Sequence, residues 1–281
     1  MRKHRLIVNA DDLGISQAVN AKIEECINKG VISSSTLLAN APAFEEGVDI
    51  AKKYPFISVG VHLNIIEFKP LTNSEIFHRY GMTDDRGCFI EGAAFVAEYD
   101  DILLQAVFEE WDAQIDKVEA AGIVPSHIDS HQHTHTIWAL NEVLCRVMDK
   151  HKIACVRRKV VPSISLMIWE KRHKTVILDK SSARSSKKRN ILSSSIHLIT
   201  SISACKRWNQ QMNGRYRMTG SFFAFRHFYY NKNHLKMGRP SSVVELMCHP
   251  GHSAYREETD KLMQNLPLLA ERYKLVSYRD L

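Results

Sequence analysis

Residues 5–14 read RLIVNADDLG, an apolar segment that runs directly into two adjacent carboxylates, Asp11 and Asp12. Its first half, residues 5–9, is a short continuous apolar run that predicts a buried β-strand. Ser16 follows as an N-cap residue for a helix whose apolar positions recur at helical spacing. A buried strand followed by an amphipathic helix is the building unit of α/β folds, so this stretch indicates the fold class.

The same unit recurs along the chain. Short apolar and β-branched runs predict a strand leading into the histidines at 127–135, and strands at residues 36–39, 57–62, 243–247 and 275–278. Apolar periodicity predicts helices at residues 44–54, 101–121, 138–150 and 257–272, with a weaker pattern near 191–208. Residues 64–95 predict irregular structure. Because no glycine-rich phosphate loop follows the first strand, the alternation favours a (β/α) TIM-like barrel, as a single domain over residues 1–281.

The composition is that of a globular protein, with 281 residues, 44% of them hydrophobic and 25% charged. No apolar run approaches the ~20 residues that span a bilayer. The apolar stretch at residues 6–8 is too short for the core of a signal peptide, so we expect a cytoplasmic location. The six cysteines are scattered without a CxxC pair, which indicates reduced, buried thiols rather than a disulfide framework or a thiolate zinc site.

One region carries the excess of positive charge. The net charge is +7, yet no acidic residue occurs between Asp179 and Glu245, where 13 basic residues lie between Lys180 and Arg239. Residues 160–240 are therefore a divergent, basic, serine-rich region within the predicted domain. Such a region could bind a polyanion or a membrane surface, or it could be a solvated insertion. The second interpretation is favoured because the region has no recognisable nucleic-acid-binding module, so nucleic acid is not an expected partner.

Residues 127–135 read HIDSHQHTH and place His127, Asp129, His131, His133 and His135 on every second residue. In an extended chain these side chains would all point to the same side. Clustered imidazoles are costly to bury unless a metal ion or carboxylates organise them, so their density indicates a metal site. The alternatives are a histidine-rich surface strand or a pH-sensitive patch. The spacing does not say which histidines bind, and the later ones are expected in a loop because strands of about nine residues are longer than usual.

Further polar groups follow other predicted strands. Of Asp11 and Asp12, one could hold a metal ion while the other accepts a proton from water, or an aspartate could only cap the next helix. His62 could be a ligand or a hydrogen-bonded core residue. His249 could protonate a leaving group or only stabilise the turn at residues 250–251. Taken together, these groups supply the ligands, the base and the acid of a metal-dependent hydrolase.

Four segments carry these groups: NADDLG (9–14), VGVHLN (59–64), HIDSHQHTH (127–135) and ELMCHPG (245–251). They resemble the signature blocks of the YdjC-like carbohydrate deacetylases, a family that includes the bacterial chitooligosaccharide deacetylase. Their order and spacing match the family over residues 5–156 and 243–281, and Lys69-Pro70-Leu71 and the C-terminal LVSYRDL also resemble it. Residues 160–240 do not.

The resemblance implies a distorted (β/α) barrel with a divalent metal ion, Mg²⁺ or Zn²⁺, at its C-terminal mouth. By this resemblance Asp12, His62 and His131 are the metal ligands, Asp11 is the general base, and His249 is the acid. The positions implied to support the ligands or to face the substrate are Asp129, His133, His135 and Asn64, and Arg157 or its neighbour Arg158 is implied to orient Asp11.

The implied reaction removes an N-acetyl group from an amino sugar or oligosaccharide. Water attacks the acetamide carbonyl, His249 protonates the departing amine, and acetate is released. The expected partner is an N-acetylated sugar, and a homodimer is the assembly considered. The sequence leaves open which sugar, which chain length and which metal ion. The basic region also raises the option of a phosphorylated, nucleotide-linked or lipid-linked amino sugar.

Three other functions compete with this one. A non-haem iron(II) oxygenase also uses two histidines and one carboxylate, but it would leave Asp11 and His249 without roles. A metal-dependent phosphoesterase suits the histidine pattern but usually needs ligands for a second metal ion. A non-enzymatic protein that binds metal or a polyanion would depend on the basic region and would tolerate Asp11→Asn.

Overall fold

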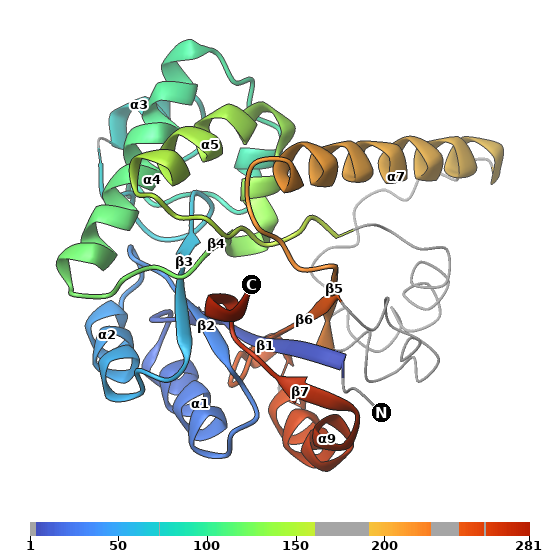
Figure 1. The fold of residues 1–281 in the computed structure, drawn as a ribbon. Helices are drawn as coiled ribbons and strands as arrows, with labels where there is room; N and C mark the ends of the chain where they lie inside the picture. Colours follow the sequence, from blue (N-terminus) through green and yellow to red (C-terminus); the bar gives the residue numbers. More distant parts are fainter. Residues whose placement is uncertain (1–3, 73, 161–190, 226–241, 256) are drawn as a thin grey trace. The chain divides into compact units, whose positions relative to one another are not determined.

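A parallel β-sheet runs through the larger of the two units into which the chain divides (Figure 1). The computed structural model describes residues 4–72, 74–160, 191–225, 242–255 and 257–281. The larger unit comprises residues 1–158 and 216–281, and the smaller one residues 159–215.

The sheet has the strand order β4-β3-β2-β1-β6-β5, with β7 also paired to β1, and all of these pairs are parallel. The strands are β1 (His4–Leu13), β2 (Ser34–Leu37), β3 (Ser58–Leu63), β4 (Ile128–Ser130), β5 (Ser221–Ala224), β6 (Val243–Cys248) and β7 (Tyr273–Leu275). Parallel bridges from Ile128 to Val156 and from Cys155 to Arg217 continue the curl of the sheet beyond β4. The result is a curled half-barrel, which confirms the predicted α/β class and is consistent with a distorted TIM-like barrel.

Helices connect and cover these strands. They are α1 (Gln17–Asn28), α2 (Phe44–Lys53), α3 (Ser74–Arg79), α4 (Asp101–Ala120), α5 (Asn141–Lys150) and α9 (Glu258–Arg272), with 3-10 turns η1 (Ala93–Phe95), η3 (Trp138–Leu140), η6 (Ser253–Tyr255) and η7 (Tyr278–Asp280). α1 begins as predicted, because Ser16 accepts a hydrogen bond from the N–H of Val19, and its apolar side faces the core. In α4, Trp111 is fully buried. No helix among the described residues is long and apolar enough to cross a membrane.

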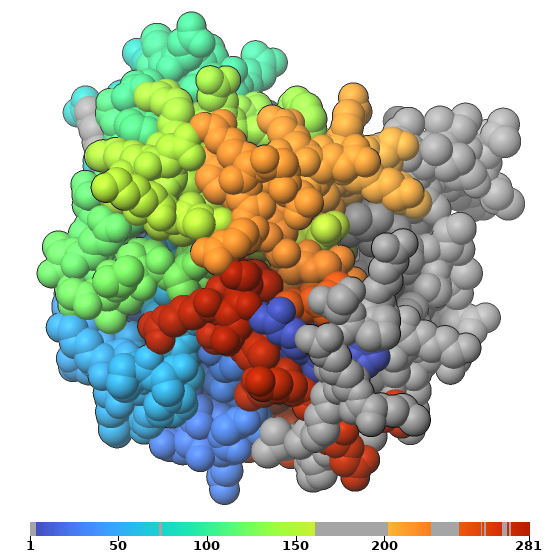
Figure 2. All heavy atoms as spheres, in the orientation of Figure 1, coloured from blue at the N-terminus to red at the C-terminus, as the bar shows by residue number. Residues whose placement is uncertain are grey.

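Several elements differ from the sequence-based expectation. β2 begins two residues earlier than predicted, and β5 and α3 were not predicted. β5 has only four residues with alternating burial, and so short a sequence pattern does not distinguish a strand from a loop. The strand predicted at residues 275–278 ends at Leu275, because the chain then turns into η7. In Figure 2 the C-terminal residues (red) lie against the first strand (dark blue), as the pairing of β7 with β1 requires.

The smaller unit contains α7 (Ile191–Asn213), which confirms the helix expected near residues 191–208. Asn209 on this helix accepts a hydrogen bond from the N–H of Lys159 and donates one to its carbonyl, both at 3.0 Å. Within the basic region, residues 161–190 and 226–240 lie outside the described residues. The predicted insertion therefore stays a prediction.

Candidate metal and active site

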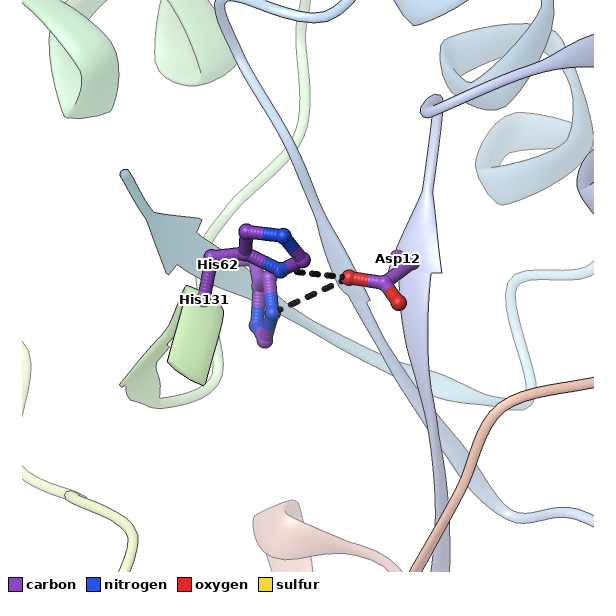
Figure 3. Close-up of side chains that lie close together, drawn as sticks. All are labelled: Asp12, His62 and His131. Carbon is purple, nitrogen blue, oxygen red and sulfur yellow. Dashed lines mark ion pairs between the residues drawn. The ribbon is translucent and has the colours of Figure 1, made fainter. Parts of the chain in front are cut away.

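Three side chains from different strand ends converge at one edge of the sheet (Figure 3). Asp12 lies near the end of β1, His62 near the end of β3, and His131 directly after β4. Asp12 Oδ1 lies 2.9 Å from His131 Nδ1 and 3.3 Å from His62 Nε2. The side chains of Asp12 and His62 are 2% exposed, and that of His131 is 12% exposed. The structure thus brings together the three residues that the resemblance implies as ligands.

A local irregularity in β1 brings Asp11 and Asp12 to the same cavity. In a regular strand, two adjacent side chains point to opposite faces of the sheet. Here Asp12 has a φ of 69°, and the register with β2 shifts between Ala10 and Leu13. Such a bulge re-aims a side chain, and both carboxylates line one cavity as a result.

The histidine run is extended only at its start. β4 ends at Ser130, and a 3-10 helix, η2 (His131–Thr136), begins there, with φ of 48° at Gln132 and 62° at His133. The later histidines therefore lie beyond the strand, which confirms that the run does not continue as one extended strand. The turn is closed by Ser130 Oγ, which accepts the N–H of His135 at 2.8 Å.

Each of the two imidazoles is held on its far nitrogen by a carboxylate. His62 Nδ1 lies 2.6 Å from Asp129 Oδ1, and His131 Nε2 lies 3.1 Å from Glu67 Oε2. When a neutral imidazole donates its N–H to a carboxylate, its other nitrogen carries a lone pair. In both rings that other nitrogen faces Asp12 Oδ1. This carboxylate–histidine arrangement is the usual one behind metal ligands.

The donor set fits a cation. Asp12 Oδ1 is buried and has no hydrogen-bond partner, although two ring nitrogens lie within 3.3 Å. Lone pairs that face a carboxylate oxygen repel it unless a proton or a metal ion lies between them. Burial lowers the pKa of His62, but the carboxylates around it, led by Asp129, outweigh burial and raise this pKa to about 10. One carboxylate oxygen and two imidazole nitrogens would suit Zn²⁺, or Mg²⁺ completed by water.

Arg157 is fully buried behind this group, in contact with three carboxylates. Its Nη1 and Nη2 donate to the two oxygens of Asp11 at 2.6 and 2.7 Å, Nη1 lies 2.6 Å from Asp129 Oδ2, and Nε donates to Glu245 Oε1 at 2.8 Å. Burial raises the pKa of Asp11, but Arg157 outweighs burial and holds this pKa well below its ordinary value. Asp11 is therefore ionised. Arg157, and not Arg158, is in contact with Asp11, because Arg158 Nε donates to a backbone carbonyl.

Among the described residues, buried carboxylates outnumber the one buried guanidinium at the site. Burial raises the pKa of Glu245, whose Oε2 accepts the hydroxyl hydrogen of Tyr278 at 2.5 Å. The carboxylates of Asp11 and Asp129 contact the guanidinium of Arg157, whereas that of Asp12 faces the two imidazoles. Without a metal ion, protons on His62 and His131, whose pKa values are raised to about 10 and about 9, offset this negative charge, and a divalent cation bound between Asp12 and the two rings would replace those protons.

His249 directly follows β6 and faces the same cavity. Its ring stacks on Tyr255, with centroids 4.6 Å apart and planes inclined by 21°. Glu258 Oε2 accepts the backbone N–H of His249 at 2.5 Å and lies 3.4 Å from its Nδ1. Burial lowers the pKa of His249, but Glu258 and then Asp11 outweigh burial and raise it. His249 is therefore biased toward its protonated form, which is the state that a general acid needs.

A cavity of about 540 Å³ joins these groups, a size that accommodates a small ligand. Its lining includes several residues that sequence reasoning missed: Ile66, Glu67, Phe89, Glu91, Gln132, Met247, His252 and Tyr255. Most of them come from residues 64–95 or follow the turn at residues 250–251, where no periodicity shows which side chains point inward. Only Glu67 offered a signal, as a carboxylate five residues after His62.

The remaining predicted residues divide into two groups. His133 lines the cavity, packs edge-on against Phe222 at 5.6 Å, and has its pKa lowered to about 3 by burial and by Arg157. His135 does not line it: Nδ1 lies 2.5 Å from Ser130 Oγ and Nε2 lies 3.3 Å from the Arg157 carbonyl. Asn64 does not line it either, because its side chain bonds within the turn that follows β3.

Two other groups of side chains among the described residues have the spacing of a metal site. Asp11, His62 and Asp129 form one, but Arg157 Nη1 already lies 2.6 Å from both aspartates. A second cation there would meet a guanidinium. The other group, Asp116, Glu119 and His151, lies at the surface away from the cavity.

The fold and the site together define an α/β protein with a candidate metal centre at the carboxyl ends of its parallel strands. The model of the YdjC-like protein family matches residues 5–276, and the chain belongs to that family.

Individual relatives match about half of the chain. A carbohydrate deacetylase of Clostridium beijerinckii is 35% identical over 153 residues, which cover 53% of this chain and 58% of the relative. Carbohydrate deacetylase 2 of Listeria innocua is 37% identical over 135 residues, covering 48% and 52%. The match thus spans somewhat more than half the length of these relatives. A solved structure, a provisionally named cellobiose-phosphate cleavage protein of Enterococcus faecalis, covers 99% of this chain and 98% of its own, with a TM-score of 0.70 and 22% identity, and supports the fold.

Proposed function

We propose that this chain is a metal-dependent hydrolase that removes an N-acetyl group from an amino sugar or oligosaccharide and releases acetate. The observation that carries the proposal is that ring nitrogens of His62 and His131 both lie close to Asp12 Oδ1, a buried carboxylate oxygen that lacks a hydrogen bond. The same cavity holds a second, ionised carboxylate and a protonatable histidine. Membership of the YdjC-like family, and relatives that bear the name carbohydrate deacetylase, agree with this assignment.

In this proposal Asp12, His62 and His131 hold the divalent ion, Mg²⁺ or Zn²⁺. When bound, such an ion polarises a carbonyl group and lowers the pKa of water near it. Asp129 and Glu67 keep the two imidazoles oriented toward Asp12.

Asp11 accepts the proton of the attacking water. The paired hydrogen bonds from Arg157 fix the plane of its carboxylate and keep it ionised. The same bonds make Asp11 a weak base on its own, so the proton it accepts has to be passed on within one turnover.

His249 donates the proton that the departing amine needs. Its raised pKa keeps a proton on the ring, and stacking on Tyr255 together with Glu258 fixes the ring's direction in the cavity. Amide cleavage needs such an acid because an unprotonated amine is a poor leaving group.

The structure favours this reaction over two-metal phosphoester hydrolysis. A second metal ion would need ligands beside the first, and the nearest set, Asp11 and Asp129 with His62, is bonded to Arg157. A single-ion site with a separate base and acid is sufficient for acyl transfer to water.

Acetate release from a panel of N-acetylated sugars tests the proposal. We expect release by the purified chain, its loss in EDTA with recovery on adding Zn²⁺ or Mg²⁺, and its loss in Asp11→Asn with metal binding retained. Asp116→Asn, a surface change away from the cavity, is the matched control and should leave release unchanged. A chain that binds metal but releases no acetate from any sugar would contradict the proposal.

A further inference from the structure

We propose that Glu67 is a positioning residue that holds the His131 ring so that Nδ1 points to Asp12 and to the metal ion. This inference rests on the proposed function, because it takes His131 as a ligand. Glu67 lies on the loop after β3, far from His131 in the sequence, and its Oε2 lies 3.1 Å from His131 Nε2.

The two candidate histidine ligands present opposite nitrogens to Asp12. His62 presents Nε2 and bonds through Nδ1 to Asp129, whereas His131 presents Nδ1 and bonds through Nε2 to Glu67. A metal ion takes the lone pair of one nitrogen, and the N–H on the other needs an acceptor. Glu67 therefore accepts the N–H of His131 that faces away from Asp12, as Asp129 accepts that of His62. The Glu67 side chain differs in being 47% exposed, whereas that of Asp129 is fully buried.

A buried network fixes the backbone of Glu67, so its contact with His131 is not an incidental surface pair. Asn64 Oδ1 accepts the N–H of Glu67 at 3.2 Å, and Asn64 Nδ2 donates to its carbonyl at 2.7 Å. Asn40 Nδ2 donates to the same carbonyl at 3.2 Å. Gln114 on α4 then bonds to both the N–H and the carbonyl of Asn64, at 2.9 and 2.7 Å. Asn64 and Gln114 are fully buried, so the loop has a rigid foundation.

A competing role for Glu67 is direct contact with the substrate, because its side chain also lines the cavity. The two roles differ in what they change. A positioning residue alters the affinity for the metal ion without any sugar present, whereas a substrate contact alters KM and leaves metal affinity unchanged.

The test is a calorimetric zinc titration of metal-free protein without sugar. We expect Glu67→Ala to weaken zinc binding about tenfold, the lower end of the range for such partners, because the side chain is half-exposed. Glu67→Gln should weaken it less, since an amide oxygen still accepts the N–H. Glu91→Ala is the matched control, because Glu91 lines the same cavity but accepts its hydrogen bond from Gln132 and not from a candidate ligand. Its removal deletes an equal charge and should change the zinc affinity little.

NMR of the zinc-loaded protein with ¹⁵N-labelled histidine gives a second readout. The Nε2–H signal of His131 should be protected from exchange with water in the wild type and in Glu91→Ala, and should broaden or vanish in Glu67→Ala. A purely electrostatic effect of Glu67 would not move this signal.

Three outcomes would overturn the role of Glu67: unchanged zinc affinity in Glu67→Ala, an equal loss in Glu91→Ala, or a change in KM alone. A wild-type chain that binds neither zinc nor magnesium would instead contradict the metal site and the proposed function with it. The two failures are therefore distinguishable.

Discussion

Replacing Arg157 with methionine tests how far this site depends on one buried guanidinium. Arg157 is fully buried and lies 2.6–2.8 Å from carboxylate oxygens of Asp11, Asp129 and Glu245. Methionine has a comparable volume and no charge, so the substitution removes the partner of three buried carboxylates while filling most of the space.

The expected loss of unfolding free energy in Arg157→Met is large. Breaking a buried ion pair by removing one partner costs ~3–5 kcal/mol, because an uncompensated charge stays buried. This compares with a total stability of ~5–15 kcal/mol for an ordinary folded protein. In a chain of this size, such a loss lowers the melting temperature by about 10 °C.

The loss of unfolding free energy in Arg157→Met should also depend on pH. With Arg157 present, the pKa of Asp11 lies well below its ordinary value, so this group contributes stability above its unfolded-state pKa and loses it only as pH falls through the lowered folded-state value. Without Arg157, burial dominates and raises the pKa of Asp11 in the folded chain. Protonation of Asp11 then removes the buried, uncompensated charge from the variant. The difference in unfolding free energy between Arg157→Met and wild type should therefore shrink as the pH falls from about 8 to about 5.

Urea denaturation in EDTA measures both effects without a metal ion. Arg158→Met is the control, because the neighbouring Arg158 is only partly buried and its Nε bonds to a backbone carbonyl. Its loss should stay near ~1 kcal/mol. The reasoning is refuted if Arg157→Met costs no more than Arg158→Met, or if its cost does not fall with pH.

Three further outcomes follow from the structure. Saturating Zn²⁺ at about a hundred times its dissociation constant should stabilise the wild type by ~2.7 kcal/mol, and a thermal-shift assay should show no such gain in Asp12→Asn. Gly60→Ala should lower the free energy of unfolding by ~1–3 kcal/mol or more, because its Cβ would lie 2.6 Å from the ring and the carbonyl oxygen of His127; wild-type stability by urea denaturation would contradict this. Tyr278→Phe should cost ~1–3 kcal/mol, since it leaves Glu245 Oε2 buried without its hydroxyl donor, and equal melting of variant and wild type would refute it.

The local signals in the sequence predicted most of the fold. Ser16 caps α1, the apolar face of that helix is buried, and α4 and β6 lie where their patterns place them. The short elements were harder to predict, because a strand of four residues such as β5 is too short to show a periodicity. The shape of the bend after Ser130 was also hidden, since Gln132 and His133 adopt left-handed conformations that only a few per cent of non-glycine residues adopt.

Residue types at strand ends determined the candidate site. Because parallel strands end at the same edge, Asp12, His62 and His131 could be expected near one another from sequence and resemblance. Tertiary structure decided what surrounds them. Only folding shows that Arg157 rather than Arg158 meets Asp11, that Glu67 stands behind His131, and that Asn64 supports a loop instead of facing the cavity. Those contacts join residues far apart in the chain, and their distances depend on how strands and loops pack, which no local pattern encodes.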